Sequence, residues 1–421
     1  MTEALYTSHF PCGARLLVEP LARVRSCALG FWVQRGSTHE GPAEEGLAHF
    51  IEHMVFKGTE HFPTPEAMAE ATDRLGGNLD AFTGKETACF YGKVLRDQLP
   101  DLVAILGDLV TSPRFDPEEL VRERDVVLEE IAQSEDTPDD WVSELFYLGF
   151  WPEAPLAHPI LGRPDQVAAF DTDRVQAFFR KTYRGPHLLI SAAGDLEPEA
   201  LEALLAPVLE RLPAGPPEAE ALVSPSRAFI TNVPRRGLQQ TSLVMGFPTG
   251  GHTHPARVAT GLLSTVLGGG MSSRLFLELR EKRALCYQVG SYLSPYRGTG
   301  ALQITASCAP GKARELVART LGECERLREQ GATPDELERA KRQARTSLVF
   351  GQESSSSRMF TLAHQAIHLD RTYTLDEQLA EIDAVDLETL NAAAREVLAP
   401  ERFSVAALGT RRGGEIRRSD L

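Results

Sequence analysis

The residues best suited to chemistry lie in segment 46–57, GLAHFIEHMVFK. His49 and His53 are four positions apart, so on a helix both imidazoles project from one face and can bind one metal ion. Glu52 directly precedes His53, which leaves its carboxylate beside the metal but not bonded to it. Histidine nitrogens are ligands of Zn²⁺, and zinc lowers the pKa of a bound water to about 7. The spacing therefore predicts a zinc site at which Glu52 takes a proton from water and passes it to a leaving amine.

The alternative is a surface helix on which both histidines are solvated. The positions around the polar residues are apolar, however: they are Phe50, Ile51, Met54 and Val55. Polar side chains on an apolar helix cost free energy unless they have partners. This environment favours the metal site.

A catalytic zinc usually has three protein ligands, and the best candidate for the third lies in segment 116–131, DPEELVRERDVVLEEI. Its start, with Asp116 as N-cap before a proline, predicts a helix. Glu130 and Glu123 fall on the edge of the apolar stripe of this helix, whereas Glu129 falls on the solvent side. The stripe itself consists of Leu120, Val127 and Ile131. We therefore predict Glu130 as the third zinc ligand. Glu123 is expected to orient an imidazole by accepting its free N–H, the alternative being an ordinary surface acid.

The chain that carries these side chains is expected to fold into more than one compact domain, because 421 residues are too many for one ordinary core. Segment 212–226 is rich in Pro, Ala and Glu and is expected to be an extended linker. It divides the chain into an N-terminal zinc-bearing domain, 1–211, and a C-terminal domain, 227–421.

The two halves have a similar order of expected elements. Each opens with strand-like runs, continues with a helix, further strands and several helices, and closes on a short apolar strand. The opening runs are 26–33 and 240–247, and the closing strands are 187–193 and 402–408. Clustered strands and clustered helices predict an α+β fold with mainly antiparallel sheets, produced by duplication of one unit.

Two helices of the second half are clear from their mixed-charge periodicity, at 312–330 and 333–349. The second begins with Thr333 and Pro334, and Glu336 follows three positions after the threonine. This spacing predicts a capping box with proline as the first helical residue.

Composition excludes several classes of partner. The net charge of −15 disfavours nucleic acid and anionic membrane surfaces, because both require clustered Lys and Arg. The six cysteines have no CxxC spacing and are expected to be buried, reduced thiols. The N-terminus has no signal or transit pattern, and no apolar run approaches the roughly 18 residues of a membrane span. Together these features predict a cytoplasmic protein.

The residues described so far resemble the pitrilysin (M16) family of metallopeptidases, whose motif has the inverted zincin order. Within it, the resemblance is to the branch of mitochondrial processing peptidases and short bacterial homologues, and it covers essentially the whole chain. The family pattern is HxxEH followed at a distance by a glutamate. Here Glu130 lies 77 residues after His53. The resemblance implies one zinc ion per chain.

The family also has a Gly-Gly-x-x-Asn-Ala-x-Thr segment, which reads GGNLDAFT at 76–83. The resemblance implies that Ala81, Phe82 and Thr83 bind the substrate peptide, which adds a strand to a sheet edge beside the zinc. Asp80 stands where the family usually has asparagine, so its role is open.

The second domain of the family usually lacks zinc ligands and contributes an arginine and a tyrosine seven positions apart. Arg280 and Tyr287 match this pair. The resemblance implies that they bind the substrate and donate hydrogen bonds to the reacting carbonyl. The alternatives are a helix-surface charge for Arg280 and a core aromatic for Tyr287.

Members of the family fold as two similar domains that close like a clamshell on an internal chamber. Both parts of the site occur in this one chain, which favours a homodimer, with a heterodimer as the alternative. We expect a zinc endopeptidase that cleaves peptides or unfolded segments. The competing hypothesis is a non-catalytic scaffold or partner subunit. Relatives of that kind usually lose part of the motif, whereas His49, Glu52, His53 and Glu130 are all present here.

Overall fold

The computed structural model describes residues 5–216, 224–410 and 415–420. Its contacts group the chain into two compact units. Unit 1 comprises Met1–Ala132, His158–Glu220 and Phe350–Thr372, and unit 2 comprises Gln133–Ala157, Ala221–Val349 and Tyr373–Leu421. The predicted linker, 212–226, lies partly outside the described residues. The predicted division of the chain at that linker stays a prediction.

Unit 1 is built on a six-stranded sheet with the order β1-β2-β6-β3-β5-β4. Its strands are β1 (Tyr6–His9), β2 (Arg15–Pro20), β3 (Ser26–Val33), β4 (Asn78–Thr83), β5 (Ala88–Leu95) and β6 (Leu188–Gly194). Only β2 and β6 pair in parallel, and the other pairs are antiparallel. Strand β4 therefore forms one edge of the sheet.

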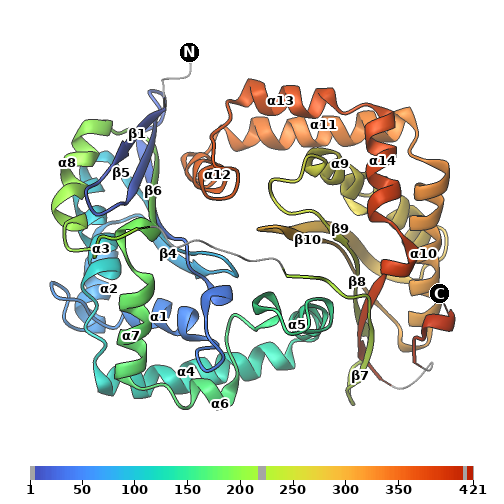
Figure 1. Cartoon of the computed structure of the whole chain (residues 1–421), viewed down its shortest axis with the longest axis horizontal. Helices are drawn as coiled ribbons and strands as arrows, with labels where there is room; N and C mark the ends of the chain where they lie inside the picture. Colours follow the sequence, from blue (N-terminus) through green and yellow to red (C-terminus); the bar gives the residue numbers. More distant parts are fainter. Residues whose placement is uncertain (1–4, 217–223, 411–414, 421) are drawn as a thin grey trace. The chain divides into compact units, whose positions relative to one another are not determined.

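Helices cover both faces of this sheet (Figure 1). The larger core includes residues of α1 (Leu47–Val55), α2 (Pro65–Arg74), α3 (Leu99–Thr111), α4 (Pro117–Asp136), α6 (Pro164–Val167), α7 (Thr172–Thr182) and α8 (Pro198–Leu209). Alternate residues of β2 and β3 point to the other face, where they pack against α12 (Ser355–His368). The sheet thus lies between α12 and the layer that contains α1.

Unit 2 is built on a five-stranded sheet with the order β7-β11-β8-β10-β9. Its strands are β7 (Ile230–Pro234), β8 (Thr241–Thr249), β9 (Cys286–Tyr296), β10 (Thr299–Cys308) and β11 (Ser404–Gly409). Its helices are α5 (Pro138–Phe150), α9 (Arg257–Gly268), α10 (Ala313–Gln330), α11 (Pro334–Gly351), α13 (Leu375–Ala384) and α14 (Leu387–Val397), and a π-helical turn spans Phe276–Glu281. Only β7 and β11 pair in parallel.

The two sheets have the same topology once β1 is set aside. If the five strands of each sheet are numbered in the order in which they occur along the chain, their order across the sheet is first, fifth, second, fourth and third in both. Each sheet is also covered by a helix from the other half of the sequence. Helix α5 packs on β8 and β11, and α12 packs on β3 and β6, which hold the same places in their sheet. The mainly antiparallel α+β fold is confirmed, and this repetition supports duplication of one unit.

Several local predictions are also confirmed. The expected second-half helices match α10 and α11, and the capping box is formed: the Thr333 N–H donates to Glu336 Oε2 at 2.8 Å, and the Glu336 N–H donates to Thr333 Oγ1 at 3.3 Å. All six cysteines are free and buried. Among the described residues, none of the helices has the length and apolar character needed to cross a bilayer.

Candidate metal centre

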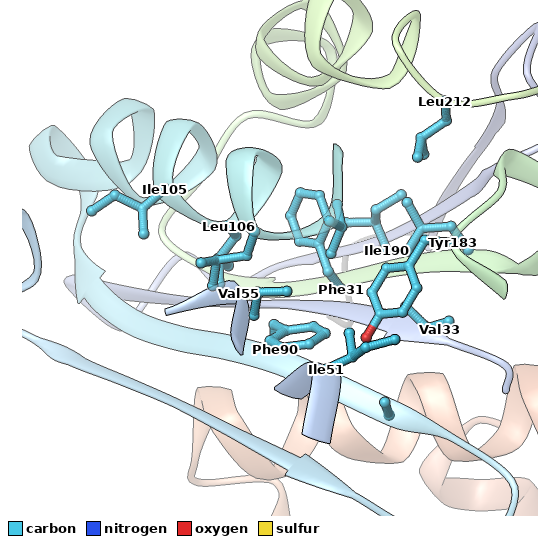
Figure 2. Close-up of a cluster of buried hydrophobic side chains, with 14 of the residues drawn as sticks. Phe31, Val33, Ile51, Val55, Phe90, Ile105, Leu106, Tyr183, Ile190 and Leu212 are labelled. Atoms are coloured by element: carbon cyan, nitrogen blue, oxygen red, sulfur yellow. The ribbon is translucent and has the colours of Figure 1, made fainter. Parts of the chain in front are cut away.

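Helix α1 is held firmly at both its start and its buried face. Gly46, its N-cap, has a φ of 97°, and a Cβ there would lie 2.8 Å from Gly162 Cα, so only glycine fits. The carboxylate of Glu40 accepts hydrogen bonds from the N–H groups of Gly46 at 2.9 Å and Ala48 at 2.8 Å. Figure 2 shows Ile51 and Val55 packed among Phe31 and Phe90 of the sheet. These contacts fix the direction in which the opposite side of α1 points.

On that side, His49 and His53 lie together with Glu130 of α4. The distance from Glu130 Oε2 to His49 Nε2 is 3.7 Å, and that to His53 Nε2 is 3.5 Å. All three candidate ligand atoms lie within 4.8 Å of one another. Bond lengths of about 2.0–2.2 Å place two ligands of one tetrahedral zinc roughly 3.3 Å apart. The spacing is therefore close to that of three ligands around one ion.

The chemistry of these three groups fits a zinc ion. His49 is only 7% exposed, so it is not a solvated surface histidine, and the alternative of a surface helix with two solvated histidines is wrong. Glu130 Oε2 is buried and has no hydrogen-bond partner among the residues that the structure describes. A buried carboxylate oxygen without a partner costs free energy, and a cation between it and the two imidazoles removes that cost.

The two imidazoles differ in their affinity for protons. Burial lowers the pKa of His49 to about 3, which keeps this ring neutral and able to bind a metal. Burial also opposes protonation of His53, but the hydrogen bond to Glu123 and the charges of Glu123 and Glu130 outweigh it and raise the pKa. Since a metal binds neutral imidazole, protonation of His53 competes with metal binding as the pH falls.

Glu123 lies directly behind His53, where the sequence led us to expect an orienting partner. It is 4% exposed, and its Oε1 accepts a hydrogen bond from His53 Nδ1 at 2.7 Å. Its Oε2 lies 2.6 Å from Lys57 Nζ. Burial would raise the pKa of Glu123, but its bonds to His53 and Lys57 lower it overall. Glu123 is thus an ionised acceptor that leaves His53 Nε2 facing Glu130.

Sequence reasoning missed Lys57, which follows the end of α1. The signal was available, because a buried carboxylate needs a counter-charge and Lys57 lies four positions after His53. Its ammonium group completes a chain of contacts from Lys57 through Glu123 to His53.

Glu52 lies beside this centre and is held from the neighbouring strand. The hydroxyl of Thr83, the last residue of β4, donates a hydrogen bond to Glu52 Oε2. Burial raises the pKa of Glu52, and the Thr83 hydrogen bond and the charge of His53 only partly oppose this. Such a carboxylate accepts protons more readily than an exposed one, which suits a general base.

The predicted peptide-binding segment forms the edge strand β4. Ala81 packs toward the core that contains α1, whereas Phe82 points to the other face and meets Trp32 with ring centroids 5.8 Å apart. Within the described part of the chain, β4 pairs only with β5, so its outer edge is open to another strand. Asp80 Oδ2 accepts a hydrogen bond from the Tyr91 hydroxyl at 3.0 Å.

Arg280 and Tyr287 lie together in unit 2. The Arg280 guanidinium is 4.7 Å from the ring centroid of Phe276 and 4.8 Å from that of Tyr287. Tyr287, on the edge strand β9, is 78% exposed, so the alternative of a core aromatic is wrong. Arg280 belongs to the π-helical turn, a form that is frequent at functional sites. The approach of this pair to the zinc residues stays a prediction.

The fold and the motif define a class of two-domain, peptidase-like proteins, and comparisons with known proteins agree. A family model described as "Insulinase (Peptidase family M16)" matches residues 15–163, and one described as "Peptidase M16 inactive domain" matches residues 169–344. Two solved structures share the fold: a peptidase M16 inactive domain from Pseudomonas fluorescens and a protease from Helicobacter pylori. The Pseudomonas structure has a TM-score of 0.91 at 22% identity, and the match covers 98% of this chain and 100% of that structure. The Helicobacter structure has a TM-score of 0.90 at 20% identity, and the match covers 97% of this chain and 100% of that structure.

Relatives of known sequence are similar over nearly their whole length. An uncharacterized zinc protease of Mycobacterium tuberculosis is 36% identical over 95% of this chain and 92% of its own. The uncharacterized zinc protease YmxG of Bacillus subtilis is 34% identical over 94% of this chain and 96% of its own. The chain belongs to the pitrilysin-type M16 peptidase family. The narrower resemblance to the mitochondrial processing branch stays a prediction.

Proposed function

We propose that this protein is a zinc metalloendopeptidase whose ion is held by His49, His53 and Glu130. The observation that carries the proposal is the position of Glu130 Oε2, which is buried, lacks a hydrogen-bond partner in the described structure and lies 3.5 and 3.7 Å from the two imidazole Nε2 atoms. The names of the relatives, which are zinc proteases, support the same choice of metal.

The residues of the chain have distinct tasks in this mechanism. Zinc, when bound, supplies the Lewis acidity that acidifies water and polarises a carbonyl. Glu52 takes the proton of the attacking water and delivers it to the leaving amine. Thr83 holds the Glu52 carboxylate through its hydrogen bond, and Glu123 keeps His53 in the ring orientation that presents Nε2.

The substrate in this proposal is an extended peptide or an unfolded segment, bound inside an internal chamber. It pairs with the open edge of β4 near Ala81, Phe82 and Thr83, since main-chain hydrogen bonds of an added strand require no particular side chains. Arg280 and Tyr287 donate hydrogen bonds to the carbonyl as negative charge develops on it. The proposal includes a cytoplasmic homodimer that does not bind nucleic acid or membranes.

The experiment is digestion of a mixed peptide library, followed by mass spectrometry, with and without a chelator. We expect cleavage by the wild type, loss of cleavage with chelator, and recovery on adding Zn²⁺. The variant Glu52→Gln should bind as much zinc as the wild type but cleave on the order of 10³-fold more slowly, because only the base is lost. Glu129→Gln, on the exposed side of α4, is the control and should cleave normally.

Two outcomes would count against the proposal. Full activity of Glu52→Gln would show that this carboxylate is not the base. Peptide binding by the zinc-loaded wild type without any cleavage would instead favour a scaffold or partner subunit.

A further inference from the structure

Helix α1, which carries both histidines of the candidate metal centre, has no side-chain cap of its own. Its N-cap residue is Gly46, which has no side chain to accept a hydrogen bond. The first N–H groups of a helix have no partners within the helix, and buried ones need an acceptor from elsewhere. His49 is the third residue of α1 and lies in this first turn. Whatever holds the first turn therefore also holds His49.

Glu40, which lies six positions before Gly46, supplies the missing acceptors. It is 6% exposed, and its two carboxylate oxygens accept from the N–H groups of Gly46 and Ala48 at 2.9 and 2.8 Å. Ala48 directly precedes His49. A side chain at the N-cap normally accepts from one backbone N–H, whereas Glu40 binds two. This buried carboxylate thus fixes the backbone at the start of the helix.

The segment before Glu40 is bound to the turn of the β4–β5 hairpin. A short 3-10 helix, Ser37–His39, directly precedes Glu40. Its first two N–H groups donate to the carbonyls of Gly84 and Lys85, at 3.2 and 2.9 Å. The Thr38 hydroxyl also donates to the Lys85 carbonyl, at 2.8 Å. Glu40 is therefore held in place by the hairpin turn.

The same hairpin holds the proposed catalytic base. Thr83, the last residue of β4, directly precedes Gly84, and its hydroxyl donates to Glu52. The hairpin thus reaches α1 by two routes: Thr83 holds Glu52, and Glu40 holds the first turn. Strand β4 is also the strand to which the substrate peptide adds in the proposed function.

We propose that Glu40 is a positioning residue of the peptidase, which sets the first turn of α1, and so His49, relative to the peptide-binding strand β4. This inference rests on the proposed function. Glu40 is not a zinc ligand in it and acts through the backbone of α1. Without this carboxylate, β4 still binds a peptide, but the zinc ion and the scissile carbonyl lose their fixed relative position. The loss therefore falls on kcat rather than on KM.

A second buried acid of unit 1 allows positioning to be separated from a purely structural role. Asp108 of α3 is 4% exposed, and its Oδ2 accepts from the Thr59 hydroxyl at 2.9 Å and from the His61 N–H at 3.2 Å. It holds the loop after α1, which contains none of the proposed zinc ligands. Replacement of either acid leaves buried donors without an acceptor and costs stability. Only replacement of Glu40 should alter the metal centre.

The test compares Glu40→Gln with Asp108→Asn in the full chain. An amide keeps one acceptor oxygen but presents an NH2 group to the second N–H, so one of the two bonds of Glu40 is lost. Burial raises the pKa of Glu40 to about 8, although its bonds to Ala48 and Gly46 lower it, so the assays are run at about pH 9. We expect Glu40→Gln to lower kcat roughly tenfold with little change in KM. Asp108→Asn should lower the free energy of unfolding but leave kcat and KM unchanged.

Cobalt in place of zinc gives a second measurement, which does not depend on cleavage. The visible absorption of bound Co²⁺ depends on the geometry of its ligands. We expect Glu40→Gln to change this spectrum, because His49 shifts relative to His53. Asp108→Asn should keep the spectrum of the wild type.

A milder variant tests the same link from the hairpin side. Thr38→Val removes the hydroxyl that donates to the Lys85 carbonyl but keeps the backbone bond. It should lower kcat by a smaller factor than Glu40→Gln, again with little change in KM. If Glu40→Gln does not fold, Thr38→Val decides the question, and a kcat equal to that of the wild type would overturn the positioning role.

Two other results would also overturn it. One is a Glu40→Gln protein with the kcat and the cobalt spectrum of the wild type. The other is an equal loss of kcat in Glu40→Gln and Asp108→Asn, which would make Glu40 a structural residue only. Failure of the wild type to cleave any peptide would contradict the proposed function instead, and the cobalt spectra would then still test the role of Glu40.

Discussion

Units 1 and 2 share the order of five strands, but they have very different side chains at equivalent positions. Helices α4 and α11 both begin with an N-cap residue, a proline and, two positions later, a glutamate. Counted from that proline, Glu123 corresponds to Ala340 and Glu130 corresponds to Ser347. Buried Leu120 corresponds to buried Leu337, so the packing position is kept while the acids are not.

The helix that follows the second of the five shared strands shows the same contrast. This helix is α1 after β3 in unit 1 and α9 after β8 in unit 2. Helix α1 carries His49, Glu52 and His53, whereas α9, with the sequence RVATGLLSTVLG, contains no histidine, acid or cysteine. One scaffold is therefore present twice, and a few side chains give only one copy a candidate metal centre. The comparison shows that the topology positions groups, whereas the identity of those groups determines the chemistry.

The largest effect is expected when α4 of unit 1 receives the residue that α11 of unit 2 has at the position of Glu130. Glu130→Ser copies Ser347 and removes one of the three proposed zinc ligands. We expect loss of the bound zinc and of cleavage, the largest effect of any single change in α4, measured by metal analysis and peptide digestion. Ser347→Ala in α11 is the matched control and should change neither. Normal zinc content in Glu130→Ser would show that Glu130 is not a zinc ligand, and that α4 and α11 do not differ in this respect.

The next largest effect tests whether unit 2 takes part in the chemistry. Tyr287→Phe removes an exposed hydroxyl and leaves the ring that stacks on Arg280. We expect a fall in kcat on the order of 100-fold with little change in KM, since in the proposed mechanism the hydroxyl donates a hydrogen bond to the developing oxyanion. Tyr292→Phe, on the same strand, is the control. Equal kcat values for both variants would contradict the proposed catalytic role of the Tyr287 hydroxyl.

A smaller effect is expected from the residue behind His53. Glu123→Gln keeps the shape of the side chain but weakens its hold on both His53 and Lys57. Loss of such a partner commonly costs 10–100-fold in metal affinity, and we expect about tenfold here. Competition with a chelator of known affinity measures this change. Unaltered affinity would make Glu123 a packing residue, like Ala340 in unit 2.

The smallest effect concerns stability alone and is expected at Glu336, the acid that α11 shares with Glu119 of α4. Glu336 accepts from Arg274 Nε at 2.7 Å and caps α11; burial opposes its ionisation, but these bonds lower its pKa to about 2. A pKa below the unfolded value of about 4.3 stabilises the protein at neutral pH, and this contribution is lost as pH falls toward 2.

We therefore expect Glu336→Gln to lower the free energy of unfolding by about 2 kcal/mol at pH 7. The difference from the wild type should shrink as the pH falls from about 4.5, and kcat should be unchanged. Denaturant unfolding across this range measures it, with exposed Glu338→Gln as the control. A difference that is independent of pH would mean that ionisation of Glu336 is not the cause.

Much of the fold and of the candidate site could be predicted from local sequence, because local patterns determine them. Period and capping predicted α11, and the i, i+4 spacing with the edge of an apolar stripe selected His49, His53, Glu123 and Glu130. Contacts made between distant segments could not be predicted in this way. The exchange of α5 and α12 between sheets and the bond from Thr83 to Glu52 depend on tertiary packing alone.

The most direct test of the central claim is X-ray diffraction from crystals grown with Zn²⁺, with data collected on both sides of the zinc absorption edge. We expect an anomalous peak about 2.0–2.2 Å from His49 Nε2, His53 Nε2 and a Glu130 oxygen, with the Glu52 carboxylate not bonded to it. Zinc-loaded crystals that show no peak between these three side chains would contradict the account.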